Sequence, residues 1–132
     1  MGFLVTRLLR EGGVVAGRTL IFSAFAVWGT AVVAVGILYW EIDRGGPVLR
    51  CTPDHARPDF LFAQMQSSGT TDRPWTPRYF DYLYLSLTNS TAFSPTDALP
   101  LTLRAKAIMA YQSLASLGTI AIVGARAVNI LK

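Results

Sequence analysis

Charged side chains are scarce in this sequence of 132 residues, where they occupy 15% of the positions. Apolar residues make up 52%, and they are concentrated in two long runs instead of being spread at the periodicity of a soluble core. This distribution is typical of a membrane protein. The net charge of +4 does not indicate nucleic-acid binding, because the twelve Lys and Arg residues are scattered and form no basic stripe with aromatic residues.

Cysteine and histidine each occur once. The single Cys51 excludes an internal disulfide and a cysteine-based metal site, which leaves a free thiol or a link between two subunits. The single His55 lies near Asp54 and Asp59, but one histidine beside scattered carboxylates is weak evidence for a metal site, and we expect solvated loop charges. The sequence has no nucleophile motif and no acid pair within the apolar runs, so we expect no enzyme, no cofactor and no metal.

The first apolar run, residues 19–40, has 22 residues and no charge. As a helix it is about 33 Å long, enough to cross a hydrocarbon core of about 30 Å. Tyr39 and Trp40 fit the aromatic belt at one interface. In residues 1–18, Phe3, Leu4, Leu8 and Leu9 can share one helical face with Arg7 and Arg10 beside it, which predicts a cytoplasmic amphipathic helix on the membrane surface. The alternative is a frayed basic leader.

Residues 41–75 combine Pro, Gly and charged residues without a sustained period, so we expect a structured extracellular cap. Thr76 and Pro77 then predict a helix start, with Thr76 as the N-cap and Pro77 as the first helical residue. The helix would run to about Asn89. Because it is apolar nearly all round, we expect it to be buried, and at about 20 Å it is too short to span a membrane.

A polar run, residues 88–91, ends this short helix, and a loop to residue 102 leads to the second long apolar run. Non-helical backbone at membrane depth is tolerated where it is buried in protein or lines water. The sequence therefore predicts a re-entrant segment over residues 76–102 whose polar run faces water or ions. The alternative places residues 76–100 wholly in the cap.

The second long apolar run covers residues 103–132, with its apolar part ending near Leu131. Gln112, Ser116, Thr119 and Val123 follow a helical spacing and share one face, which predicts the lining of an aqueous pore. The alternative is helix packing, because Gln, Ser and Thr also join membrane helices. Two spans put both termini on one side, which we take to be the cytoplasm.

The order of outer helix, cap, short helix, polar loop and inner helix resembles the two-transmembrane potassium channels of the pore-loop cation channel superfamily. Residues 84–102, YLSLTNSTAFSPTDALPLT, align without a gap with a family stretch of the form YFSVVTLTTVGYGDIYPVT. Six positions match: Tyr84, Ser86, Thr91, Asp97, Pro100 and Thr102. The resemblance implies an all-α membrane protein with two transmembrane helices and a re-entrant pore helix and loop, assembled as a homo-oligomer, most simply a tetramer.

The resemblance fails at the filter itself, where the family has Thr-Val-Gly-Tyr-Gly-Asp. The family's filter glycines allow backbone conformations that Ser94 and Thr96 disfavour, and Pro95 fixes its own φ and lacks an N–H. Ala92 also replaces the family's filter threonine. A potassium filter of the family's geometry is therefore not expected. The predicted filter and ion-binding residues are Ser90, Thr91, Ala92, Phe93, Ser94, Pro95, Thr96 and Asp97.

We therefore predict a cation channel of the cell membrane that does not select potassium, with inorganic cations, lipid and other copies of the chain as partners and no nucleic acid. Two alternatives stay open: a pore closed by Phe93, or a non-conducting structural or accessory protein that uses the same fold. No Arg-rich helix precedes Thr19 and no further domain follows Lys132, so we expect voltage or ligand gating to need another chain.

Overall fold

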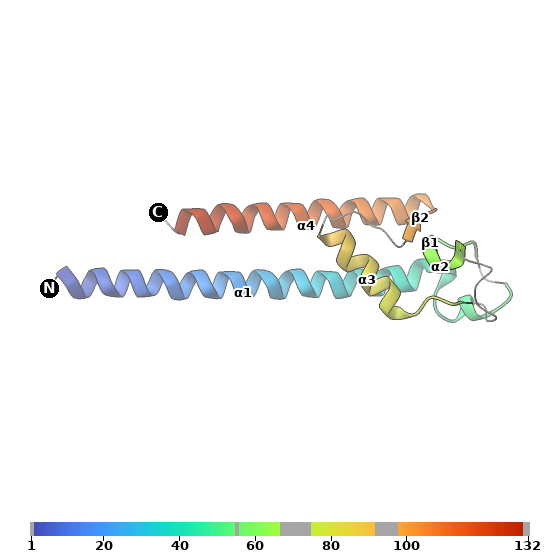
Figure 1. Ribbon diagram of the computed structural model, residues 1–132, viewed down its shortest axis with the longest axis horizontal. Helices are drawn as coiled ribbons and strands as arrows, with labels where there is room; N and C mark the ends of the chain where they lie inside the picture. The colour runs from blue at the N-terminus through green and yellow to red at the C-terminus, as the bar shows by residue number, and fades with distance from the viewer. Residues whose placement is uncertain (1, 55, 67–74, 92–97, 131–132) are drawn as a thin grey trace.

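The computed structural model describes residues 2–54, 56–66, 75–91 and 98–130. Two long helices and a short third one dominate the structure, and two 3-10 helices, two short strands and a single helical turn complete it. The elements in chain order are α1 (Gly2–Ile42), η1 (Asp43–Gly45), η2 (Leu49–Cys51), β1 (Phe60–Phe62), α2 (Ala63–Gln66), α3 (Tyr79–Ser90), β2 (Ala98–Pro100) and α4 (Leu103–Ile130). Figure 1 shows α1 and α4 side by side, with α3 crossing obliquely near one end.

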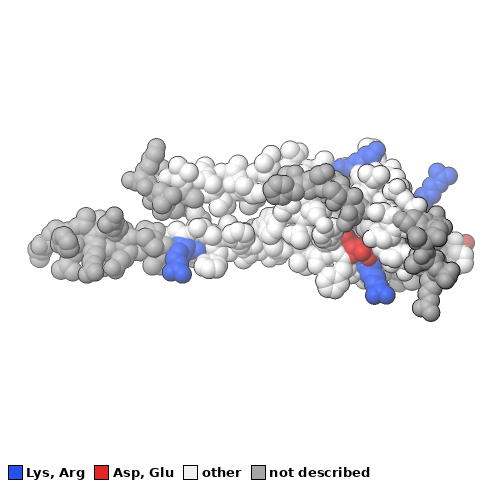
Figure 2. Space-filling model, in the orientation of Figure 1, with Lys and Arg blue, Asp and Glu red and all other residues white. Residues whose placement is uncertain are grey.

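Both long helices are long and apolar enough to cross a membrane, over Gly17–Gly45 and Leu103–Arg126. Most of their side chains lie on the surface of the chain, and the exposed fractions of Phe22 and Ile122 are 70% and 71%. A soluble helix of this length would bury an apolar face. Figure 2 shows the coloured charged side chains towards the two ends of the molecule. The two apolar spans predicted from the sequence are confirmed as helices of this kind.

The first long helix begins much earlier than the predicted span. α1 is one continuous helix from Gly2 to Ile42, so residues 2–18 extend it without a break. Residues 1–18 contain no proline to interrupt the helix at the expected boundary. α1 ends where Arg44, Gly45 and Gly46 take positive φ angles of 56°, 81° and 103°, values that favour glycine.

The short helix begins two residues later than predicted. Thr76 is not its N-cap and Pro77 is not its first residue, because Arg78 is the N-cap and Tyr79 opens α3. The side chain of Asp81 accepts a 2.6 Å hydrogen bond from the backbone N–H of Arg78. An acidic side chain three residues after the N-cap residue stabilises a helix start in this way. This interaction makes Arg78 the N-cap instead of Thr76.

The cap contains a feature that the sequence did not predict. Strand β1 pairs antiparallel with β2, with Phe60 opposite Pro100 and Phe62 opposite Ala98. The ladder is three residues long, and it joins the cap to the segment just before α4. Around it lies the hydrophobic core, which collects side chains from α1, α3, α4 and both strands: Tyr39, Phe60, Phe62, Tyr82, Leu85, Ala98, Ala105 and Met109.

Helix α3 approaches α1 closely at one glycine. A Cβ atom placed on Gly36 would lie 3.2 Å from the Cα atom of Leu83, closer than ordinary van der Waals contact. Gly36 is buried, and its missing side chain lets the two backbones approach. This contact holds α3 in the half of α1 that is nearest the cap.

Candidate functional site

A buried polar network fixes α3 between α1 and α4. Gln112 of α4 is at its centre, with an exposed fraction of 5%. Its Oε1 accepts hydrogen bonds from the Tyr39 hydroxyl at 2.7 Å and from Asn89 Nδ2 at 2.9 Å. Its Nε2 donates to the Ser86 hydroxyl at 2.7 Å and to the Ser86 carbonyl at 3.0 Å. One amide therefore connects all three helices.

The neighbours of Gln112 are also fully hydrogen-bonded. The Ser86 hydroxyl donates to the carbonyl of Val32 at 2.8 Å. Asn89 Nδ2 donates to the carbonyl of Met109 at 2.9 Å, and Asn89 Oδ1 accepts from the Ser113 hydroxyl at 3.1 Å. Buried polar groups rigidify a structure when every one of them is paired. The network therefore fixes the position of the C-terminal half of α3.

The polar run at the end of α3 is more buried than expected. We predicted that residues 88–91 face water or ions, but the exposed fractions of Asn89 and Ser90 are 6% and 2%. Asn89 follows Ser86 by three residues, so both lie on the face that meets α4. The hydroxyls of Thr88, Ser90 and Thr91 donate to carbonyls of their own helix. A contact of Ser90 or Thr91 with ions stays a prediction.

The remaining predicted filter residues, 92–97, lie outside the described residues. The structure describes the positions on either side of them. Thr91 follows the last residue of α3, and Ala98, which is buried, begins strand β2 beside the cap. Residues 92–97 therefore follow the C-terminal end of α3 and precede the strand that pairs with β1 of the cap.

The face of α4 that was predicted to line a pore has a mixed environment. Gln112 is buried against α1 and α3, and these contacts are those of the helix-packing alternative. Ser116, Thr119 and Val123 continue the same face and are half-buried. The Thr119 hydroxyl donates to the carbonyl of Ala115 at 2.8 Å. Lining of an aqueous path by this face stays a prediction.

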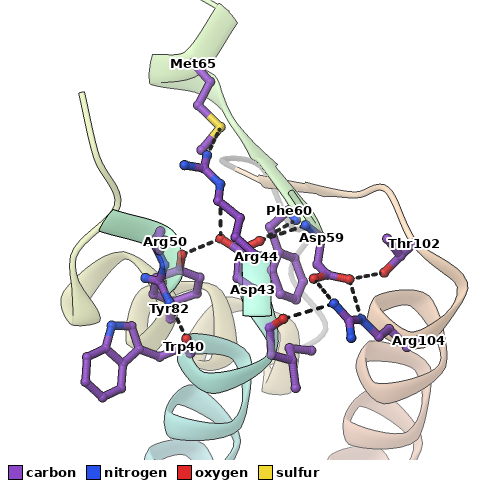
Figure 3. Close-up of polar contacts among 11 residues, drawn as sticks. Trp40, Asp43, Arg44, Arg50, Asp59, Phe60, Met65, Tyr82, Thr102 and Arg104 are labelled. Carbon is purple, nitrogen blue, oxygen red and sulfur yellow. Dashed lines mark hydrogen bonds and ion pairs between the residues drawn. The ribbon is translucent and has the colours of Figure 1, made fainter. Parts of the chain in front are cut away.

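A second polar cluster joins the cap to the starts of both α3 and α4 (Figure 3). We expected Asp59 to be a solvated loop charge, and this is wrong, because Asp59 is completely buried. Both of its oxygens bind the guanidinium of Arg104, with Nε to Oδ1 at 2.6 Å and Nη2 to Oδ2 at 2.5 Å. The hydroxyl of Thr102 donates to the same carboxylate. The desolvation of a buried carboxylate requires such partners.

Asp43 has a similar role at the end of α1. Its side chain is also completely buried, and it accepts hydrogen bonds from the backbone N–H of Asp59 at 2.7 Å and of Phe60 at 3.3 Å. Its second oxygen accepts from the Tyr82 hydroxyl at 2.6 Å. The guanidinium of Arg50 lies over the Tyr82 ring, 5.0 Å from its centre, and donates to the carbonyl of Trp40. Asp43 therefore connects α1, β1 and α3.

The pKa of Asp59 lies below its ordinary value. Burial alone would raise it, but the hydrogen bonds from Arg104 and Thr102 and the positive charge of Arg104 outweigh burial and lower it. The carboxylate is therefore ionised at neutral pH, and the start of α4 is attached to the cap by an ion pair.

Neither buried carboxylate was singled out as structural from the sequence. A weak signal exists for each one, since Asp43 directly follows an apolar helix and Asp59 directly precedes the apolar triplet 60–62. The described residues contain no group of three or more His, Cys, Asp or Glu side chains that could hold a metal ion. Cys51 is exposed on the cap.

These features define a helical hairpin that is apolar enough to cross a membrane, with a short third helix fixed between its two arms. Comparison with known proteins finds no protein family, no curated protein and no solved structure that matches this chain.

Proposed function

We propose that the chain is a subunit of a cation channel with a re-entrant pore helix and loop, assembled as a homo-oligomer around a central path, most simply a tetramer. The observation that carries the proposal is the depth of α3 between two helices that can cross a membrane. The resemblance to pore-loop channels over residues 84–102 supports the same assignment.

The depth of α3 follows from its contacts. Tyr79, at its start, packs edge-to-face on Trp40 near the cap end of α1, with ring centres 6.0 Å apart. Ser86 bonds to Val32, eight residues further from the cap. Asn89 bonds to Gln112, nine residues after the start of α4 at Leu103. At 1.5 Å per residue, these contacts put Ser86 and Asn89 about 12–14 Å below the levels of Trp40 on α1 and Leu103 on α4.

That depth is close to half of a hydrocarbon core of about 30 Å. After α3 the chain returns to the cap, because Ala98 pairs with Phe62. Backbone that enters a bilayer and leaves on the same side needs protein or water around its polar groups. A central path between several copies of the chain would supply that water.

The electrostatics of α3 favour cations. The C-terminal end of a helix carries a partial negative charge of about half an elementary charge. The last turn of α3 holds no basic residue that would neutralise it. This end leads directly into residues 92–97, where Asp97 is the acidic residue. Carbonyls and hydroxyls near Thr91 and Ser94, with a ring of Asp97 carboxylates, would attract partly hydrated cations.

The selectivity differs from that of potassium channels in this proposal. Ser94 and Thr96 replace the two filter glycines, and Pro95 between them restricts the backbone. We therefore assign weak selectivity among cations. We place both ends of the chain in the cytoplasm and the cap outside the cell membrane.

A second candidate function is a non-conducting accessory protein with the same fold. The complete internal pairing of Gln112 and Asn89 favours it, because these groups need neither water nor ions. The two candidates differ in whether the purified protein carries current.

Recordings from the purified protein in planar bilayers test the proposal. We expect unitary currents carried by several monovalent cations, with a cation-to-anion permeability ratio that falls in Asp97→Asn. The Asp54→Asn variant is a matched control, because Asp54 is an exposed carboxylate of the cap. Absence of current with every monovalent and divalent ion tested would favour the accessory protein.

A further inference from the structure

An apolar groove of about 460 Å³ lies between α1 and α4, on the side of α3 away from the cap. Its walls come from Ala24, Phe25 and Trp28 of α1 and from Ile120, Val123 and Gly124 of α4. Thr91, which follows the last residue of α3, also lines it. The groove is therefore bounded by both long helices and by the end of the short one.

The groove has few groups that could bind a polar ligand. Its two hydroxyls belong to Thr91 and Thr119, and each of them donates to a carbonyl of its own helix. The other lining side chains are apolar, and Trp28 is the one exception with an N–H. A ligand that fills this space must be apolar along its length.

The position of the groove indicates where such a ligand comes from. Trp28 and Ile21 precede Trp40 by 12 and 19 residues on α1, so they lie about 18–29 Å from the cap end of the span. This is the half of a bilayer nearest the two ends of the chain. The apolar material at that depth is the acyl chains of one leaflet.

Two cations lie one turn beyond the groove, on the helix faces that line it. Arg18 precedes Ile21 by three residues and Phe25 by seven, and Arg126 follows Val123 by three and Thr119 by seven. Both spacings keep residues on one face of a helix. Both arginines are exposed, and guanidinium groups at this level reach the phosphates of lipid headgroups.

We propose that this groove binds one acyl chain of an anionic phospholipid, whose headgroup lies at Arg18 and Arg126. A helix of a second copy is a poorer fit, because it would bring two more arginines to the level of Arg18 and Arg126. The proposal does not rest on ion conduction, since the groove and both cations are present in a single chain. It assigns Thr119 and Val123 to the acyl chain, in place of the aqueous path that the sequence predicted for their face of α4.

Lipid retention tests the proposal. The protein is reconstituted in vesicles with equal amounts of phosphatidylglycerol and phosphatidylcholine and extracted in a mild detergent. Mass spectrometry of the intact protein then counts the lipids bound to each copy. We expect about one phosphatidylglycerol per copy for the wild-type protein. Arg18→Gln and Arg126→Gln should each lower the preference for it about five-fold, as expected for one arginine near an anionic surface.

A groove-filling variant separates the groove from general lipid adhesion. Gly124→Leu adds a side chain in the groove, and a Cβ at Gly124 meets no atom within 4 Å, so the helix tolerates it. We expect Gly124→Leu to remove the retained lipid. Gly118→Leu is the matched control, because Gly118 has the same open surroundings on α4 and does not line the groove. Lys106→Gln, which changes an exposed cation at the cap end of α4, is the control for charge.

Two results would overturn the proposal. The first is equal retention of the two lipids by the wild-type protein. The second is unchanged lipid retention in Gly124→Leu. If that variant also changes the number of copies per complex, the groove belongs to a second copy. None of these measurements depends on current, so they remain distinct from the test of conduction.

Discussion

Asn89 of α3 donates a 2.9 Å hydrogen bond to the side-chain oxygen of Gln112 of α4, and both side chains are buried. The contact joins the last turn of the short helix to the middle of the second span. This hydrogen bond holds the end of α3 at the level of Gln112 on α4, and the loop after α3 begins at that level.

Replacement of Gln112 by Leu should destabilise the protein more than any exposed change on α4. The variant leaves the Tyr39 hydroxyl, the Asn89 amide and the Ser86 hydroxyl with fewer partners. Hydrogen bonds between membrane helices contribute about 0.6 kcal/mol each on average, so four of them give about 2 kcal/mol. Denaturant unfolding in detergent measures the difference. Ser116→Ala, one turn further on, should change stability by less than about 0.5 kcal/mol.

The Asp59–Arg104 pair predicts a loss of stability in acid. Because the pKa of Asp59 is lowered by folding, its contribution is fully present above the ordinary carboxylate pKa of about 4 and is lost as the pH falls through the lower, folded value. We therefore expect no loss of Asp59-dependent stability from pH 7 to 5 and a progressive loss below about pH 4. Thermal unfolding at several pH values measures it.

Asp59→Asn is the companion variant for the pH experiment. It should lower stability at pH 7 by about 1–3 kcal/mol, a discounted range because Arg104 is 54% exposed and partly solvated. The difference between the wild-type protein and Asp59→Asn should shrink below pH 4. A constant difference down to pH 2 would show that Asp59 does not titrate with a folded-state partner.

Gly36 and Gly29 lie on the same helix and predict opposite responses to a larger side chain. Gly36→Val places atoms against the backbone of Leu83, while the Cβ of Gly29 meets no atom within 4 Å. We expect Gly36→Val to cost about 1–3 kcal/mol through overpacking, and Gly29→Val to be neutral or slightly stabilising. Equal effects on unfolding would contradict the close approach of α1 and α3.

Cys51 provides a direct test of orientation. It is exposed on the cap, and it is the single cysteine of the sequence. A membrane-impermeant maleimide should label Cys51 in intact cells. Arg126→Cys in a Cys51→Ala background should be labelled after the membrane is opened and not before. The reverse pattern would place the cap in the cytoplasm.

The long helices were predictable because uncharged, mainly apolar runs of about 20 residues have few alternatives to a membrane span. The residues at which the helices begin were harder to predict. The N-cap of α3 is Arg78 instead of the predicted Thr76, because the Asp81 carboxylate accepts a hydrogen bond from the Arg78 N–H. A capping interaction of this kind competes with a proline signal, and the sequence does not show which one wins.

The contacts that hold the cap could not be predicted, because they join residues far apart in the chain. Strands β1 and β2 are three residues long, and their paired residues are 36 to 40 positions apart in the sequence. Asp59 bonds to Arg104 across 45 positions, and a single acidic residue in a polar segment has a solvated surface as its usual environment. For Gln112 the sequence left two alternatives, pore lining and helix packing, and its hydrogen bonds in the single chain are those of helix packing.

The most direct measurement of the central claim is the accessibility of position 97 to a charged thiol reagent during current recording. In a Cys51→Ala background, Asp97→Cys would be recorded in a planar bilayer while a cationic methanethiosulfonate is added on the cap side. We predict that the current falls sharply within seconds, while the background protein with Asp97 intact is unaffected. Current that is unchanged after complete labelling of the introduced thiol, or the absence of current in both proteins, would contradict a cation path lined by this loop.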